Sequence, residues 1–380
     1  MIAKKTNDSK MVGMSKNILK YSLIWLSALS INSCTNNGEE IKKAASPATA
    51  YDPRVFIVGN YLPDREGAKL WNRGQATTLS DGDQATSIFI SGSDIYAAGF
   101  RTKLTSGTEI DGNCSGTCTF SPVAKYWKNG VPVEITDRMK GDAMANSIFV
   151  SGNDVYVAGQ QHNEIITDGK GGNSFALSWK NGIADTLTDG THYAEARSIF
   201  VSGADVYVCG QDGNQYIAAT AKYWKNGVPV NLTDGKQGAA ASSIVISGND
   251  VYVAGFEGNA INTVAKYWKN GIAIPLTDGS HWAEARSIFV VGSDVYVAGF
   301  DNFQAVYWKN GEKIILSDLS SSAESIFVSG TDVYVVGSDN VNGAQFWKNG
   351  TGVNVSNQNN TMVTAKSIFV APVNFVPGNH

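Results

Sequence analysis

Histidine and cysteine are scarce in this chain, with four of each among 380 residues. The histidines do not stand at a spacing typical of metal ligands; they are His162, His192, His281 and His380. The sequence also has no nucleophile elbow and no glycine-rich phosphate loop. We therefore predict no metal site, no cofactor and no catalytic residue.

Charge is sparse as well. Charged residues make up only 17% of the chain, whereas glycine reaches 40 residues, a composition typical of a turn-rich, strand-rich fold. The first 33 residues carry five lysines and one aspartate, so the remainder, with 25 basic and 33 acidic residues, lies near a net charge of −8. An acidic surface argues against a nucleic-acid partner, because phosphates need basic neutralisation.

The apolar run at the N-terminus is too short to cross a bilayer. It covers residues 21–31, about 11 residues against the roughly 20 that a span needs, and it follows Lys16 and Lys20. This pattern is typical of an export signal. The run ends in Ile-Asn-Ser-Cys at positions 31–34, which resembles a bacterial lipobox. The resemblance implies a signal peptide over residues 1–33 and acylation of Cys34.

An ordinary cleaved signal and an uncleaved anchor remain as alternatives. Either Met1 or Met14 is a candidate start, and Met14 gives the more usual signal length. Thr35, directly after the cysteine, favours sorting to the outer membrane of a Gram-negative cell, on either of its sides. Residues 34–50 are small and polar, as expected of a flexible tether.

One sequence pattern recurs seven times over residues 51–380. Its first half is S-I-F-V-S-G-N-D-V-Y-V-A-G, and its second half is A-K-Y-W-K-N-G followed by V-P-V-N-L-T-D-G. Its tryptophans, which we expect in the core, are Trp71, Trp127, Trp179, Trp224, Trp268, Trp308 and Trp347. Each full unit has four short strand signals, and the spacing of 38 to 60 residues matches one propeller blade. The sequence therefore predicts an all-β, seven-bladed propeller of four-stranded blades.

The two ends of the chain are expected to complete one blade. Residues 367–370 match the first strand of the pattern and then stop matching, while residues 55–59 match the second strand. Pairing these segments would remove the open edge of the ring. In the six unbroken units an aspartate lies in the turn between these strands, where we expect it to accept hydrogen bonds; Arg54 holds that place in the split unit. The lysines of Lys-Asn-Gly are expected to be solvated.

The Tyr-x-x-Gly of the first half, followed by the tryptophan, resembles kelch and other propeller repeats, although the kelch double glycine is missing. Over residues 51–375 the chain is similar to uncharacterised repeat lipoproteins of Gram-negative bacteria. The resemblance implies the propeller fold and is nearly silent on function.

Two turns of each unit are fixed in length and two vary. The fixed turns join strands one to two and three to four, and we call their face the bottom. On the opposite top face, the interval from the strand-two glycine to the tryptophan is 28 residues after Gly99, 20 after Gly159 and 9 to 14 elsewhere. Ligand sites usually lie on variable loops held by a rigid scaffold, so the top is the expected binding face.

Two top connections share a distinctive sequence, T-H-Y-A-E-A-R at 191–197 and S-H-W-A-E-A-R at 280–286. In extended backbone the glutamate and arginine point to one side, and we expect them near the mouth of the central channel. With the aromatic residue they could stack on and hydrogen-bond a sugar or a peptide. The candidate ligand-binding residues are His192, Tyr193, Glu195, Arg197, His281, Trp282, Glu284 and Arg286. The alternative is a structural ion pair copied by repeat duplication.

These patterns favour a monomeric, lipid-anchored, non-catalytic binding scaffold of the outer membrane that engages a protein or a glycan. A carbohydrate-active hydrolase or lyase using the Glu195/Arg197 and Glu284/Arg286 pairs is the first alternative, and a structural envelope protein is the second. Cys114 and Cys118, in the longest top connection, are candidates for a small disulfide in an oxidising periplasm. Cys209 replaces a strand-two alanine and is expected to be a buried thiol.

Overall fold

The computed structural model describes residues 52–378 apart from 62–66, 111–112, 136–141, 163–172, 215–217, 260, 319 and 356–362. All of these described residues belong to one compact unit, Ala50–His380. The expected signal peptide, the tether, Cys34 and His380 lie outside them, as do the side chains of Cys114 and Cys118. Among the described residues, no helix has the length and apolar character that a bilayer crossing requires.

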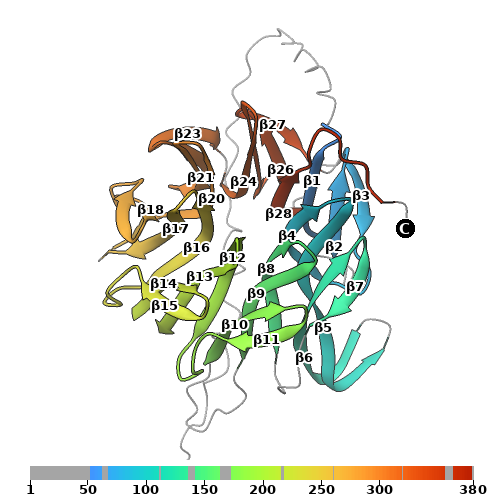
Figure 1. Ribbon diagram of the computed structural model, residues 1–380. Coiled ribbons are helices and arrows are strands. Elements are labelled where there is room, and N and C mark those ends of the chain that lie inside the picture. The colour runs from blue at the N-terminus through green and yellow to red at the C-terminus, as the bar shows by residue number, and fades with distance from the viewer. Residues whose placement is uncertain are drawn as a thin grey trace, which may run out of the picture. The chain divides into compact units, whose positions relative to one another are not determined.

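The described residues form seven antiparallel sheets of four strands, arranged as blades around one axis (Figure 1). Blade 1 combines the two ends of the chain, and blades 2 to 7 follow in chain order. For blades 1 to 7 the innermost strands are β28 (Val363–Val370), β4 (Gln84–Ser91), β8 (Ala143–Ser151), β12 (Ala194–Ser202), β16 (Ala239–Ser247), β20 (Ala283–Val291) and β24 (Ser321–Ser329). The second strands are β1 (Val55–Tyr61), β5 (Asp94–Ile110), β9 (Asp154–His162), β13 (Asp205–Asn214), β17 (Asp250–Gly258), β21 (Asp294–Asp301) and β25 (Asp332–Asp339).

The remaining strands lie toward the rim of the ring. The third strands are β2 (Ala68–Asn72), β6 (Asn113–Lys128), β10 (Ser174–Lys180), β14 (Ala218–Lys225), β18 (Thr263–Lys269), β22 (Gln304–Lys309) and β26 (Gly343–Lys348). The outermost strands are β3 (Gln75–Thr78), β7 (Val131–Glu134), β11 (Ile183–Thr186), β15 (Val228–Asn231), β19 (Ile272–Pro275), β23 (Glu312–Ser317) and β27 (Thr351–Asn354). The predicted seven-bladed, all-β propeller is confirmed.

Each interface between neighbouring blades has its own apolar core. The second strands are buried on both faces, which explains their continuous apolar sequence. Each of the seven cores holds one repeat tryptophan, and these side chains are only 0–4% exposed. Cys209 is a fully buried thiol in one of these cores, and burial raises its pKa. The expected core role of the tryptophans and the buried state of Cys209 are confirmed.

A ring of hydrogen bonds links the innermost strands to one another. The first serine of each repeat accepts a hydrogen bond through Oγ from the isoleucine amide of the next blade, at 3.2–3.3 Å. The seven pairs, serine first, are Ser87–Ile148, Ser147–Ile199, Ser198–Ile244, Ser243–Ile288, Ser287–Ile326, Ser325–Ile368 and Ser367–Ile88. The last two include strand β28, so the ring runs through the split blade without a gap.

A β-bulge interrupts the pairing of every innermost strand one residue before this serine. Opposite each bulge lies the strand-two glycine of the repeat. A Cβ on Gly299, for example, would overlap the carbonyl oxygen of Glu284. The repeat therefore needs glycine here because the bulged strand leaves no room for a side chain, not because of a special backbone angle.

The aspartate in each bottom turn holds three neighbours. In the six unbroken blades one carboxylate oxygen accepts from an asparagine amide at 2.7–2.9 Å. The other faces a tyrosine hydroxyl at 3.3–3.5 Å and a lysine Nζ at 2.7–3.4 Å. The predicted role of the aspartates is confirmed. The lysine side chains are 40–55% exposed, as expected, and they also form ion pairs and lie over the tyrosine rings, because both partners stand on adjacent strands.

The longest top connection is a hairpin rather than a loop. Strands β5 and β6 pair far beyond the blade, as far as Ile110 and Asn113. The segment is rich in threonine, which favours extended structure on a half-exposed surface. Much of the second long connection, residues 163–172, lies outside the described residues.

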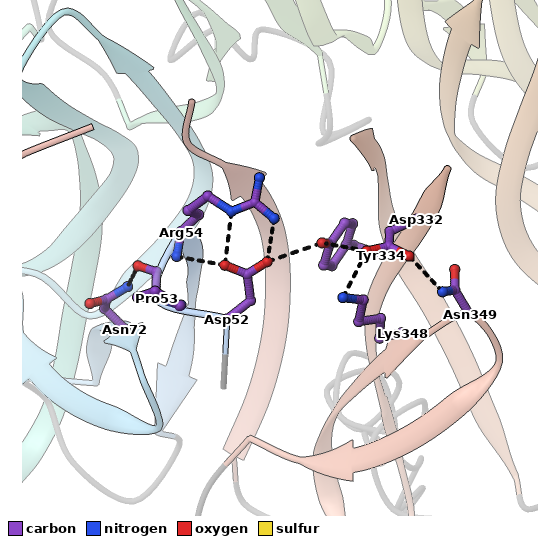
Figure 2. Close-up of polar contacts among 8 residues, drawn as sticks. All are labelled: Asp52, Pro53, Arg54, Asn72, Asp332, Tyr334, Lys348 and Asn349. Carbon is purple, nitrogen blue, oxygen red and sulfur yellow. Dashed lines mark hydrogen bonds and ion pairs between the residues drawn. The ribbon is translucent and has the colours of Figure 1, made fainter. Parts of the chain in front are cut away.

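Closure of the ring rests on pairing of β1 with β28, as predicted. Asp52, which the repeat does not include, strengthens this junction. Its carboxylate accepts from the Arg54 side chain at 2.6 and 3.0 Å and from the Tyr334 hydroxyl of blade 7 at 3.1 Å (Figure 2). The hydrogen bond from Arg54 and the other contacts lower the Asp52 pKa to about 2, against the opposing effect of burial. Asp52 therefore ties the N-terminal strand to the neighbouring blade.

The C-terminal tail covers the bottom of the same junction. Phe375 packs edge-on against Phe56, with ring centres 5.5 Å apart, within the core between blades 1 and 2. The amide of Ala371 donates to the carbonyl of Arg54, and that of Gly378 donates to the carbonyl of Ser93. Three separate contacts thus hold the C-terminal tail against the split blade and its neighbour, blade 2.

We expect Gly299→Ala to destabilise the protein by about 3 kcal/mol, because the new methyl group displaces the bulge that carries Arg286. The control is Gly292→Ala, in a bottom turn with open space around it, where only the positive φ of 59° is unfavourable. That change should cost about 1 kcal/mol. Urea unfolding measures both, and equal midpoints would contradict the role given to the bulge.

We expect Asp52→Asn to cost about 2 kcal/mol at neutral pH. Because folding lowers the Asp52 pKa from 3.8 to about 2, its contribution is complete above pH 4 and is lost as the pH falls toward 2. The difference in unfolding free energy between wild type and Asp52→Asn should therefore shrink over this range. The exposed Glu312→Gln is the control for loss of one negative charge, and a pH-independent difference for Asp52→Asn would contradict the account.

Candidate functional site at the axis of the ring

The bulge residues form a ring of polar side chains around the top of the axis. The innermost strands contact one another in sequence around the whole circle, so their bulges lie at one level. The bulge residues of blades 1 to 7 are Lys366, Thr86, Asn146, Arg197, Ser242, Arg286 and Glu324. Bulges re-aim side chains, and here each blade presents a different group on the same backbone. We call this set the bulge ring.

An arc of aromatic rings lies below the bulge ring, three residues further along the innermost strands. Neighbouring phenylalanine rings contact one another at centre distances of 4.6–5.3 Å. In order around the axis they are Phe200, Phe149, Phe89, Phe369, Phe327 and Phe289. Blade 5 interrupts the arc with Val245. The polar bulge ring thus has an apolar layer beneath it.

In blade 4 the predicted Glu–Arg pair is present and closed. Arg197 Nε lies 2.9 Å from Glu195 Oε2. The other carboxylate oxygen accepts from the amide of Asn146 in blade 3 at 3.2 Å. The Tyr193 hydroxyl donates to Glu195 at 3.3 Å. Burial, and to a smaller extent the Glu195 carboxylate, raise the Tyr193 pKa. Both carboxylate oxygens of Glu195 therefore have partners from this blade or the preceding one, which is typical of a structural network.

In blade 6 the same sequence makes different contacts. Arg286 pairs with Glu284 of its own strand, with Nε 3.4 Å from Oε2, and it also forms a close ion pair with Glu324 of blade 7. Its guanidinium stacks on Phe300, 4.9 Å from the ring centre. Burial opposes the charge, but Glu324 and Glu284 outweigh this effect and raise the Arg286 pKa. The charges of this copy extend toward the next blade.

The two charged copies flank the blade with the smallest side chains. Blade 5 contributes Ala240 and Ser242 where blades 4 and 6 contribute glutamate and arginine. Burial lowers the Arg197 pKa, but Glu195 and other groups outweigh this effect and raise it. The Glu284 carboxylate of blade 6 is one of these groups and acts across blade 5. Oppositely charged groups on two non-adjacent blades therefore interact electrostatically across blade 5.

The histidines and the aromatic residues of the two copies lie above the ring on the top face. His192 and His281 are exposed, and Nδ1 of each lies 2.9 Å from the hydroxyl of the residue before it. Trp282 is 45% exposed and stands edge-on against Phe300 and Phe303, at 5.2 and 5.9 Å. Within the described residues, no group of three or more metal-ligating side chains is close enough to hold an ion.

The predicted site residues are thus brought into two groups rather than one. The glutamates and arginines were expected in loops, but they lie in the first residues of the innermost strands. The bulge allows strand pairing to extend to the residues before the serine. Sequence reasoning missed the contribution of Phe300 and Phe303, whose positions vary between blades and carry no motif. A signal for them existed in the shortest top connection, residues 299–308, which is rich in aromatic residues.

Comparisons with known proteins show likeness of fold alone. No protein-family model matches the chain, and no curated protein matches its sequence. The computationally designed Ika8 protein aligns with a TM-score of 0.42 and 16% identity, over 79% of this chain and 83% of its own. A Trypanosoma rangeli sialidase, solved with 2,3-difluorosialic acid as a covalent intermediate, aligns with a TM-score of 0.43 and 9% identity, over 77% and 55%. A puromycin-hydrolysing peptidase of Mycobacterium tuberculosis aligns with a TM-score of 0.48 and 11% identity, over 77% and 50%. The chain spans about half the length of the last two.

Proposed function

We propose that the protein is a non-catalytic binding module of the cell envelope, anchored through acylated Cys34, that holds a protein or glycan ligand on its top face. The bulge ring carries this proposal. Seven positions with the same backbone geometry hold basic, acidic, amide and hydroxyl side chains, while the core of the blades repeats unchanged. Varied polar groups on a constant scaffold are the arrangement by which rigid folds display binding residues.

The charges of the ring favour a polar ligand over a highly charged one. Glutamates at two levels of the innermost strands, Glu195, Glu284 and Glu324, accompany three cations, Arg197, Arg286 and Lys366. Five of these six charges meet an opposite partner within the ring. Burial opposes ionisation of Glu324, but Arg286 and then Lys366 lower its pKa. A ligand would therefore meet hydrogen-bonding groups rather than one uncompensated field.

The hydrolase or lyase alternative needs two carboxylates that act as a pair. Glu195 and Glu284 stand on different blades, and each accepts from the arginine of its own strand. This pairing supports binding and orientation more than acid–base chemistry. The purely structural alternative explains the closed network of blade 4 but not the exposed Trp282.

The test compares ligand capture by the full-length wild-type protein with capture by two variants, which carry the same new side chain on opposite faces. Ser242→Arg adds a long cationic side chain to the bulge ring, between the charged copies of blades 4 and 6, and Thr331→Arg lies in an exposed bottom turn. The probes are a glycan array and a solubilised envelope extract, with unfolding midpoints as the control for folding. We expect wild type and Thr331→Arg to capture the same ligand, and Ser242→Arg to lose at least tenfold in affinity.

Capture that survives in Ser242→Arg would contradict a site on the ring, and no capture by any form would favour the structural role. Turnover of an array glycan that Glu195→Gln or Glu284→Gln abolishes, with the fold intact, would replace binding with the enzyme alternative.

A further inference from the structure

A separate hollow opens on the top face between blades 6 and 7. It has a volume of about 200 Å³, below the roughly 300–1,000 Å³ of pockets for drug-sized ligands. Its lining residues are Trp282, Arg286, Phe300, Phe303, Ser320, Ser321, Ser322, Ser338 and Asn340. One wall is therefore aromatic and the other carries hydroxyl and amide groups. A single ring-sized ligand fits this space, with an apolar face on one side and polar atoms on the other.

The aromatic wall is exposed at a conformational cost. Asn302 and Phe303 form the two-residue turn between β21 and β22, with φ of 51° and 63°. Glycine is the usual residue in the second of these places, and a bulky side chain there is strained. Phe303 is nevertheless 51% exposed, beside Trp282. Strain that holds an apolar ring in water does not serve the core, and such outliers cluster at binding sites.

Blade 4 shows that the repeat does not require this wall. There the residue equivalent to Trp282 is Tyr193, which turns to Glu195 and also bonds to Gln211. Gln211 holds the register position that Phe300 holds in blade 6. Two copies with the same Glu-Ala-Arg sequence have thus diverged, one into a closed polar network and the other into an open aromatic wall.

The polar wall has free hydrogen-bonding groups but no free charge. In the part of the chain that the structure describes, the side chains of Ser320, Ser338 and Asn340 have no hydrogen-bond partner. Arg286 is the one charged residue of the hollow, and Glu284 and Glu324 already neutralise it. An anionic ligand would have to compete with two carboxylates. A neutral ligand rich in hydroxyl groups would not.

We propose that this hollow binds one neutral hexopyranose unit of a glycan. The C–H face of the sugar lies on Trp282, with Phe303 beside it, and its hydroxyl groups bond to Ser338 and Asn340. The inference rests on the proposed function and names the ligand class of that top face. Trp282 carries most of the contact because indole offers the largest aromatic face.

Acrylamide quenching of tryptophan fluorescence tests the proposal on the full-length protein. All of the described tryptophans except Trp282 are at most 4% exposed. Subtracting the fluorescence of Trp282→Phe removes the contribution of all the other tryptophans and leaves that of Trp282. The probes are lactose, cellobiose, maltose and N,N′-diacetylchitobiose, with 3′-sialyllactose as the anionic comparator. We expect at least one neutral sugar to lower the Trp282 quenching constant at least twofold at saturation, and the anionic sugar to act at least tenfold more weakly.

Variants separate binding from folding. In calorimetric titrations, Trp282→Ala should abolish binding and Asn340→Ala should weaken it at least fivefold, while Thr331→Ala, in an exposed bottom turn, leaves it unchanged. Phe303→Gly should weaken binding at least threefold and keep or raise the unfolding midpoint, since it relieves the turn. Loss of binding in all variants together with loss of fold would overturn the assignment.

Other results would also overturn this inference while leaving the proposed function standing. These are a neutral sugar that still binds to Trp282→Ala, a preference for the anionic sugar, or protection of Trp282 by a proline-rich peptide but by no sugar. In each case capture that Ser242→Arg loses would still support the top-face binding module.

Discussion

The hydrogen bonds from the isoleucine amides to the serine hydroxyls of the preceding blades are the interaction on which the rest of this structure depends. Each bond is modest by itself, at 3.2–3.3 Å and partly buried. Together they fix the height of each innermost strand against the next, all the way around the axis. The β1–β28 pair brings the last strand into this circle, and Asp52 and Phe375 secure it from the bottom. Without closure, strand β28 would have no partner in its own sheet.

The register of the innermost strands decides what the top face displays. Because the bulge comes directly before the serine, every blade presents its variable side chain at the same level. The strand-two glycine makes this possible, since any larger residue would overlap the bulged backbone. The side chains at this level then interact across blades, as Asn146 does with Glu195 and Arg286 with Glu324. A repeated backbone rule thus produces a surface that is not repeated.

The sequence predicts the fold and its closure because each recurring residue type performs the same local task in every blade. Serine bonds to the next blade, glycine faces a bulge, tryptophan fills an interface, and asparagine-glycine makes a tight turn. The Glu–Arg pairs were also predictable, since residues two apart share one side of a strand. The partner of Arg286 was not, because Glu324 is 38 residues away and on another blade. Asp52 lies just before the repeat pattern begins, and the exposure of Phe303 follows from a turn whose strain no motif announces.

The account's central claim is that the seven serine–isoleucine bonds form one closed, cooperative ring, on which the bulge ring and its ligand depend. Native-state amide hydrogen exchange measures this directly at the seven isoleucine amides. We predict that all seven, including Ile88 and Ile368 beside the split blade, exchange only by global unfolding and give the same free energy. Faster exchange at Ile368 and Ile88 than at Ile199 and Ile244 would show that the ring opens at its junction, and would contradict the claim.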